Sequence, residues 1–373
     1  MPRRNPRIVL LGEFPPPPGG MAQQAELLAD SLEREGCRVS RCRTNIHWSG
    51  PLRRVESFRY LRTLVKLPLI YGRFVHALGG ASVCHIFSNS YVSFALFTAP
   101  ALLICRGLGV RVIVNFHGGA AEAFLSSHAW WAVPLLRRAD VLSVPSPYLR
   151  EIFGRHYLRA SVIPNLINLE QFADRPRVQG SARFIVTRHL EPVYGIDTVL
   201  RAFARIVQAV PAATLTVVGG GSQAAPLRQL RDALGLQECV RFTGQVENAR
   251  LPELYAQADI FLNGSRVDNA PVAILEAFAG ALPVVSTRAG GIGSLVTHGL
   301  TGLLVEIDDA EALADAALTL LHHPEQARAL AANALAVARA STWSHVRLQW
   351  YEYYHLDDPA PPASASQVPP LRA

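Results

Sequence analysis

Short runs of β-branched and other apolar residues alternate along the chain with longer segments of helical periodicity. This alternation is typical of βαβ units, in which helices join parallel strands and cover the faces of a sheet. The alternation is interrupted at the polar segment 173–182, which contains Pro176 and Gly180 and has the composition of an interdomain linker. The pattern therefore predicts two α/β domains with parallel sheets.

Six strands are predicted on each side of the linker, at 7–11, 38–42, 82–87, 111–115, 141–144 and 161–163, and at 183–186, 214–218, 240–242, 260–262, 283–286 and 302–305. A single core stops growing at about 250 to 300 residues, and the chain has 373. We predict Rossmann-like domains at 1–176 and 177–341, a helix at 342–357 that crosses back to the first domain, and a disordered tail at 358–373. The cleft between the domains is the expected site, because open α/β sheets bind ligands outside the carboxyl ends of their strands.

Composition narrows the class of protein. Half of the residues are apolar and 17% are charged, which is typical of a globular protein and excludes a disordered chain. The net charge of +7 favours anionic partners: nucleotide phosphates, an acidic membrane surface or nucleic acid. No RNP-like, zinc-knuckle or homeodomain pattern occurs, so no nucleic-acid partner is expected.

The five cysteines are odd in number and include no C-x-x-C pair. They encode neither a disulfide framework nor a zinc site, and they indicate a reducing, cytoplasmic location. The basic start of the chain is interrupted by Gly12 and Glu13 after a few apolar residues, so it predicts a strand rather than a signal peptide. The longest apolar stretch, 91–105, is shorter than the ~18 residues of a membrane-spanning helix and predicts a buried helix.

Two loops that follow predicted strands carry glycine pairs. Gly19 and Gly20 precede an amphipathic helix, where backbone N–H groups and the helix dipole favour an anion. An ordinary strand-to-helix turn has the same pattern, and the dinucleotide motif G-x-G-x-x-G is absent. In the second loop, His117 stands at the end of an apolar strand, directly before a glycine pair. A polar ring that can carry a charge there is as consistent with a functional role as with a structural one.

The densest signal is N-G-S-R-V-D-N-A-P-V-A-I-L-E-A-F-A-G-A-L-P-V-V-S-T-R-A-G-G at 263–291. Seven residues separate Asp268 from Glu276, and Pro271 suits the first turn of a helix. If the intervening residues are helical, the carboxylates lie about 12 Å apart along the axis. Because a glycosidase acid pair is roughly 5 to 9.5 Å apart, we expect these carboxylates to bind two parts of an elongated ligand instead.

This segment resembles the donor-binding region of glycosyltransferase family four, the glycosyl transferases group 1. In that family a carboxylate, seven residues and a glutamate are followed by E-A-x-A-x-G-x-P-V-V, G-G and G-x-L-V. The chain has Asp268, then Glu276 in E-A-F-A-G-A-L-P-V-V, then G-G at 290–291 and T-G-L-L-V at 301–305. Weaker matches in the same order are P-P-P-P-G-G at 15–20, H-G-G at 117–119, R-R-A-D-V-L-S-V-P-S at 137–146, I-P-N at 163–165, V-V-G-G-G at 217–221 and R-F-T-G-Q-V at 241–246.

The resemblance implies the GT-B fold, an α/β architecture of two Rossmann-like domains facing each other across a cleft. It implies a retaining, metal-independent transfer of a sugar from a nucleotide diphosphate sugar to a glycan or lipid-linked acceptor, in polysaccharide, exopolysaccharide or cell-envelope glycan synthesis. The N-terminal domain would bind the acceptor and the C-terminal domain the donor. No cofactor is expected besides the nucleotide-sugar co-substrate, and a D-x-D metal motif is absent.

The resemblance also assigns roles to residues. The catalytic candidates are His117 near the reacting sugar, Asp268 at the sugar and phosphate, and Arg188 at the diphosphate. Arg188 also follows a predicted strand, where a guanidinium makes strong bonds to phosphate; a surface salt bridge is its structural alternative. The donor-binding candidates, besides Arg188, are Glu276 at the ribose, Gln245 and Val246 beside the base, the backbone of Asn269, Ala270 and Pro271 at the sugar and phosphate, and the loop residues Gly19, Gly20 and Tyr194.

Two positions depart from the family's pattern. Tyr194 lies in the loop where a lysine is usual, so one charge partner of the diphosphate is missing or comes from elsewhere. Ser294 stands where G-G-x-x-E has its acid. Two alternatives therefore stay open: a non-catalytic nucleotide-sugar-binding or scaffold protein of the same fold, and a nucleotide-sugar epimerase.

Segment 51–74 mixes basic, aromatic and aliphatic residues at near-helical spacing. It is either a helix that rests on an anionic membrane surface or a packed helix with a solvated basic face. The first interpretation would place the protein peripherally at the inner face of the plasma membrane and would favour a lipid-linked acceptor.

Overall fold

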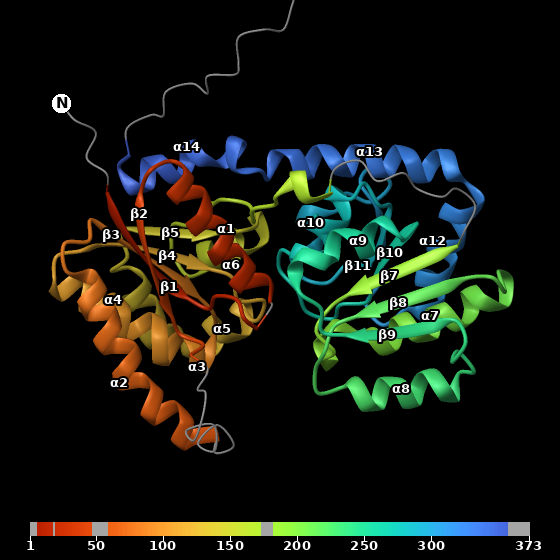
Figure 1. Ribbon diagram of the computed structural model, residues 1–373, viewed down its shortest axis with the longest axis horizontal. Coiled ribbons are helices and arrows are strands. Elements are labelled where there is room, and N and C mark those ends of the chain that lie inside the picture. Colours follow the sequence, from red (N-terminus) through yellow and green to blue (C-terminus); the bar gives the residue numbers. More distant parts are fainter. Residues whose placement is uncertain (1–5, 18, 47–58, 173–181, 357–373) are drawn as a thin grey trace, which may run out of the picture.

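The computed structural model describes residues 6–17, 19–46, 59–172 and 182–356, which form two α/β halves lying side by side (Figure 1). The expected linker at 173–182, except its last residue, and the expected tail lie outside the described residues. So does the first part of the basic segment 51–74. Within the described parts no helix has both the length and the apolar character needed to cross a membrane.

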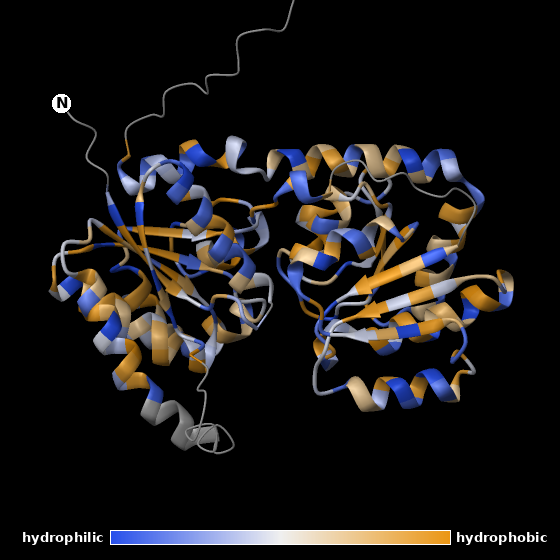
Figure 2. Cartoon of the chain, viewed as in Figure 1, coloured by the Kyte–Doolittle hydropathy of each residue, from blue (hydrophilic) through white to orange (hydrophobic). Residues whose placement is uncertain are grey.

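Each half contains one six-stranded parallel sheet, as the sequence predicts. The first has the order β2-β1-β3-β4-β5-β6 and the second β12-β11-β10-β7-β8-β9. The central strands of both sheets, such as β3 and β10, are buried between helices and are mostly apolar (Figure 2), whereas the edge strands β2 and β9 are partly exposed and carry polar residues. The strands are β1 (Arg7–Gly12), β2 (Arg38–Arg43), β3 (Val83–Ser88), β4 (Arg111–Phe116), β5 (Val141–Val144), β6 (Ser161–Val162), β7 (Arg183–Thr187), β8 (Thr214–Val218), β9 (Val240–Gly244), β10 (Ile260–Asn263), β11 (Val284–Thr287) and β12 (Leu303–Val305).

Helices join successive strands and cover both sheets (Figure 1). In the first half they are α1 (Gly20–Arg34), α2 (Arg59–Leu78), α3 (Tyr91–Ser93), the π-helical η2 (Phe94–Thr98), α4 (Ala99–Gly107), α5 (Ala121–Leu136) and α6 (Pro147–Arg155). In the second half they are α7 (Ile196–Ala209), α8 (Ala224–Ala233), α9 (Leu251–Ala256), α10 (Val272–Ala279), α11 (Ile292–Leu295), α12 (Ala310–His322) and α13 (Pro324–Ala340). Helix α14 (Trp343–Tyr354) follows α13 and packs on the first half. Short 3-10 turns occur at η3 (Leu169–Phe172), η4 (Pro192–Tyr194) and η5 (Asn248–Arg250).

The apolar stretch 91–105 was expected to be one buried helix, and this expectation is partly wrong. The chain is helical there but passes through α3, η2 and α4, and Val92 and Leu103 are exposed. The buried residues of this stretch, such as Phe94 and Leu102, pack into the core beside the first sheet.

The last helix returns to the first half of the molecule. Val346, Trp350 and Tyr354 of α14 are buried in one cluster with Ile8 and Leu10 of β1. Helix α13 lies over the second half, where it packs on α10, so α13 and α14 together run along both halves (Figure 1). Because α13 packs on the second half and apolar side chains of α14 are buried in the first, these two helices stabilise the relative placement of the two sheets.

Candidate active site

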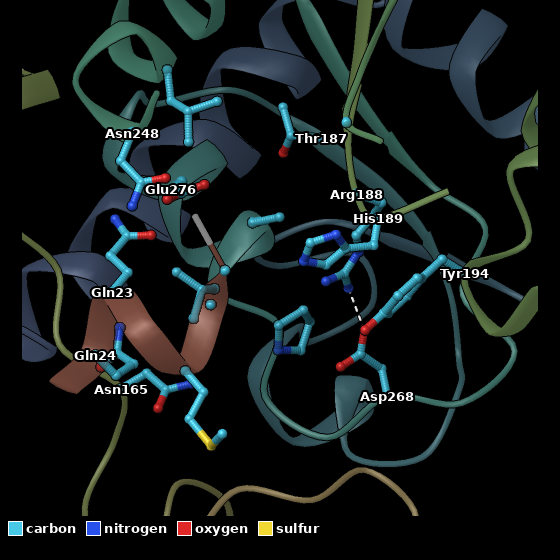
Figure 3. A pocket seen from close by; sticks show the side chains of 18 of the residues that line it. Gln23, Gln24, Asn165, Thr187, Arg188, His189, Tyr194, Asn248, Asp268 and Glu276 are labelled. Atoms are coloured by element: carbon cyan, nitrogen blue, oxygen red, sulfur yellow. Dashed lines mark hydrogen bonds and ion pairs between the residues drawn. The ribbon is translucent and has the colours of Figure 1, made fainter. Parts of the chain in front are cut away.

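A cavity of about 310 Å³ lies where the carboxyl ends of the two sheets face each other. Its walls come from the ends of strands and the segments that follow them, at β1, β3, β4, β6, β7, β8, β9 and β10. The cavity therefore lies where ligands of parallel sheets are expected to bind. Figure 3 shows side chains from α1 of the first half meeting side chains of the second half around this space.

The structure brings together most of the residues that the sequence and the resemblance indicated. Those that line the cavity are Gly19, Gly20, His117, Arg188, Tyr194, Gln245, Val246, Asp268, Ala270, Pro271 and Glu276. Asn269 is the exception and does not line it. Its backbone N–H donates to Asp268 Oδ1 at 2.9 Å, and its buried side chain accepts from the hydroxyl of Ser146 in the other half. These bonds fix Asn269 between the neighbouring Asp268 and the other half.

Glu276 stands at one end of the cavity on α10 and is 3% exposed. The hydroxyl of Tyr255 donates to its Oε2 at 2.9 Å, and the side chain of Gln23 from α1 also bonds to it. Burial raises the pKa of the Glu276 carboxyl to about 7, against the lowering effect of these bonds and of Arg188. A carboxylate held in this way can accept further hydrogen bonds from a ligand in the cavity.

Arg188 and Asp268 stand at the other end (Figure 3). Arg188 follows β7, its Nη2 forms an ion pair with Asp268 Oδ2, and its Nε donates to Asn263 Oδ1 at 3.0 Å. The guanidinium carbon lies 5.1 Å from the centre of the Tyr194 ring, within the range of a cation–π contact. Tyr194, where the family usually has a lysine, therefore contacts the Arg188 charge and adds none of its own.

His117 lines the cavity from the first half of the molecule. Burial lowers the pKa of its imidazole to about 4, which favours the neutral ring over the charged one at pH 7. The following glycines let this loop approach its neighbours. A Cβ at Gly118 would lie 2.5 Å from Ser90 Oγ, and one at Gly119 would lie 3.8 Å from the Asp268 Cα.

The N-termini of two helices meet across the cavity. A Cβ at Gly20, the first residue of α1, would lie 3.5 Å from Val272 Cγ2 at the start of α10. Helix N-termini carry partial positive charge and free N–H groups, so both favour an anion in the space beside them. Helix α10 begins only at Val272, so Asp268 lies in the loop before it. The condition of the estimate of about 12 Å between Asp268 and Glu276, a continuous helix, is therefore not met.

The second glycine pair supports that loop. Gly290 has φ +50°, and a Cβ there would lie 2.2 Å from the carbonyl oxygen of Asp268; the N–H of Gly291 donates to the same oxygen at 3.0 Å. Ser294, where this chain departs from the family's pattern, lies outside the cavity. Its side chain is exposed, and its hydroxyl donates to the Gly291 carbonyl. Ser294 is therefore not part of the cavity wall.

Sequence reasoning missed several polar residues of the wall: Gln23, Gln24, Asn89, Asn165, Thr187, His189 and Asn248. Thr187 and His189 flank Arg188 at a strand end, and this position alone could have indicated them. Asn165 belongs to the I-P-N match and donates to the carbonyl of Ala270 at 2.8 Å, which joins the two halves. Gln23 and Gln24 carried no signal, because polar residues on a helix face usually point to solvent.

Clusters of three or more His, Cys, Asp or Glu side chains suited to a metal ion do not occur in the part of the chain that the structure describes. Of the charged side chains at the cavity, Arg188 and Asp268 form an ion pair, and Glu276 accepts a hydrogen bond from Tyr255.

Two family models match consecutive parts of the chain. Residues 7–165 match the glycosyl transferase 4-like domain and residues 168–337 match the glycosyl transferases group 1. The chain belongs to the group 1 glycosyl transferases. It is a glycosyltransferase with the GT-B fold, as the resemblance of its motifs predicted.

Related proteins agree with this assignment. A GDP-mannose-dependent α-(1-6)-phosphatidylinositol monomannoside mannosyltransferase of Mycolicibacterium smegmatis is 25% identical over 360 residues, which are 87% of this chain and 91% of that protein. Its namesake from Mycobacterium tuberculosis is 28% identical over 275 residues, 65% of this chain and 71% of that one. Among solved structures, Anabaena HepE in complex with UDP-glucose has a TM-score of 0.73 at 21% identity, covering 92% of this chain and 98% of HepE.

The buried carboxyl of Glu276 makes a testable contribution to stability. Its pKa is about 7 in the folded protein against 4.5 ordinarily, so the unfolded chain loses this proton more readily and the folded state is destabilised as pH rises from 4.5 through 7. The full penalty is about 3 kcal/mol above pH 7. We expect Glu276→Gln to have a higher Tm than wild type at pH 8, with the difference shrinking at pH 5. Equal differences at both pH values in calorimetry would contradict the assignment; Glu311→Gln, at an exposed site, is the control.

Proposed function

We propose that this glycosyltransferase moves a sugar from a nucleotide diphosphate sugar to a hydroxyl of a glycan or lipid-linked acceptor, with retention of anomeric configuration. The observation that supports this most is that one cavity contains Glu276 at one end, Arg188 and Asp268 at the other, and His117 from the opposite half. An elongated ligand with a polar end and an anionic middle matches this order of groups.

In the proposed complex the donor lies mainly in the C-terminal half. Glu276 accepts hydrogen bonds from the ribose, the base lies beside Gln245 and Val246, and the diphosphate reaches the N-termini of α1 and α10. Arg188 makes charge-assisted bonds to the diphosphate and offsets the negative charge that grows on it as the bond to the sugar breaks. Asp268 holds Arg188 in place and accepts from a sugar hydroxyl.

The acceptor enters from the N-terminal half, beside His117. As the bond between the anomeric carbon and the diphosphate oxygen breaks, the acceptor oxygen forms its bond on the same face, and its proton passes to the departing phosphate oxygen. A neutral His117 fits a role in hydrogen bonding to the sugar, since a neutral imidazole has both a donor and an acceptor nitrogen. Closure of the two halves around the donor would exclude water and limit hydrolysis.

Two observations favour a role in polysaccharide or cell-envelope glycan synthesis at a membrane surface. Two relatives act, by their names, on a phosphatidylinositol monomannoside, and another is named an exopolysaccharide phosphotransferase, although the match covers only 20% of that protein. The net charge of +7 also favours an anionic membrane surface. We propose a peripheral association with the inner face of the plasma membrane.

A turnover assay tests the proposed reaction. Purified protein is incubated with UDP-, GDP- and ADP-sugars, with and without membrane lipid extract as a source of acceptor, and products are separated and their anomeric configuration read by NMR. We expect one donor class to be consumed with acceptor and the product to keep the donor's α or β configuration. Inversion would reject the retaining mechanism, free altered nucleotide sugar without acceptor would indicate an epimerase, and binding without turnover would indicate a scaffold.

A further inference from the structure

The cavity is poor in cations for a site that holds a diphosphate. Its described wall includes one arginine, Arg188, and no lysine, because the chain's single lysine is Lys66 on α2. The charge of Arg188 is already offset by its ion pair with Asp268, and His117 is neutral. An anionic ligand therefore needs a further partner beside the two helix N-termini.

His189 is placed to be that partner. It follows Arg188 directly, lines the cavity and is exposed within it. A Cβ at Gly19, the residue before α1, would lie 3.8 Å from its Nε2, so the ring nitrogen faces the glycine pair across the cleft. Figure 3 shows its ring beside Arg188 and on the same side of the cavity as Tyr194, whose ring centre lies 6.5 Å away.

The neighbours of His189 are consistent with this placement. Two carboxylates lie within electrostatic reach of its ring: Glu13 from the loop after β1 and Glu191 on its own loop. Glu191 is engaged by Ser222, whose N–H and hydroxyl both donate to it. Glu13 belongs to the opposite half and interacts with His189 across the cleft. A bound anion would compete with the Glu13 carboxylate for His189.

We propose that His189 donates a hydrogen bond to the diphosphate of the donor, and so supplies the contact that Tyr194 cannot make where the family usually has a lysine. This inference rests on the proposed function, since it names one contact of the same donor. In the complex, the imidazole of His189 and the N–H groups at Gly19 and Gly20 lie on one side of the diphosphate, and Arg188 lies beside them.

The test is calorimetric titration of the full chain at one pH with UDP, GDP and ADP and with the matching monophosphates. For the diphosphate that wild type binds, His189→Ala is expected to weaken binding about tenfold. The affinity of this variant for the matching monophosphate should fall by less. His189→Lys should restore most of the diphosphate affinity because the lysine ammonium can donate to the same phosphate oxygens. His322→Ala, at an exposed position on α12 outside the cavity, is the matched control and should change neither value.

Each outcome decides the inference separately from the proposed function. If His189→Ala weakens both nucleotides equally or neither, or if His189→Lys binds as poorly as His189→Ala, the contact to the diphosphate is wrong while the proposed donor class survives. Glu13→Gln is a second test, because it removes a carboxylate that competes for His189. It should tighten binding of the diphosphate when His189 is present and not when His189 is replaced by alanine. If wild type binds none of the three diphosphates, the proposed function fails together with this inference.

Discussion

Replacement of Arg188 by alanine is expected to lower kcat about 100- to 1,000-fold, the usual loss when one group that stabilises a developing negative charge is removed. Arg188 is the charged side chain beside the proposed diphosphate, and its Nε bond to Asn263 and its pair with Asp268 fix its orientation. The loss should appear in kcat more than in KM, because negative charge grows on the diphosphate only as the sugar departs. Steady-state kinetics with saturating acceptor measure it.

The same substitution leaves Asp268 partly buried without its partner, which by itself destabilises a protein. Arg188→Lys keeps the charge but loses the planar donor geometry, and should recover part of kcat with a near-normal Tm. Arg183→Ala is the matched control. Arg183 begins the same strand and pairs with Asp259 at 3.0 Å, at the end away from the cavity. We expect it to lower Tm and leave kcat unchanged; equal kcat losses in Arg183→Ala and Arg188→Ala would contradict the assigned role.

Replacement of Glu276 by alanine is expected to raise KM for the donor about 10- to 100-fold, the effect of losing one or two hydrogen bonds to a charged group. A ribose far from the breaking bond is bound equally well in the ground and transition states, so kcat should change little. The split between KM here and kcat at Arg188 distinguishes the two ends of the cavity. A kcat loss at Glu276 as large as that at Arg188, with KM unchanged, would contradict the proposed orientation of the donor.

The pH dependence of KM checks the same residue. Because the pKa of Glu276 is about 7, the carboxylate is present above that pH and mostly protonated below it, and the carboxylate is the stronger acceptor. Donor KM of the wild type should therefore fall as pH rises through 7. Glu276→Gln should remove that change, and an unchanged profile in this variant would assign the titration to another group.

The fold could be predicted from sequence because its signal is repeated. Each of the twelve predicted strands lies within a residue or two of an observed one, since a parallel strand buried on both faces is a short apolar run bounded by loops. The helical stretch 91–105 was less predictable. Its apolar residues are divided between the core and the surface, and the one-dimensional pattern does not separate Phe94 from the exposed Val92.

The residues of the cavity were predictable where a motif and a strand end indicate them, as for His117 and Arg188, or where a motif alone does, as for Glu276 on α10. It was not predictable where a contact joins distant segments. The ion pair of Arg188 with Asp268 spans 80 residues, and the bond of Gln23 to Glu276 crosses between the halves. The hydrogen bond from the Ser146 hydroxyl to Asn269 also joins the two halves. Such contacts follow from the packing of two domains, which a local pattern does not describe.

The orientation of the donor between Glu276 and Arg188 is tested most directly by a crystal structure of the protein with the nucleoside diphosphate that it binds. We predict the ribose hydroxyls at the Glu276 carboxylate and the diphosphate between Arg188 and the Gly19–Gly20 loop, with its terminal phosphate directed towards His117 and Asp268. A nucleotide bound outside this cavity, or one with its ribose beside Arg188 and its phosphates at Glu276, would contradict the account.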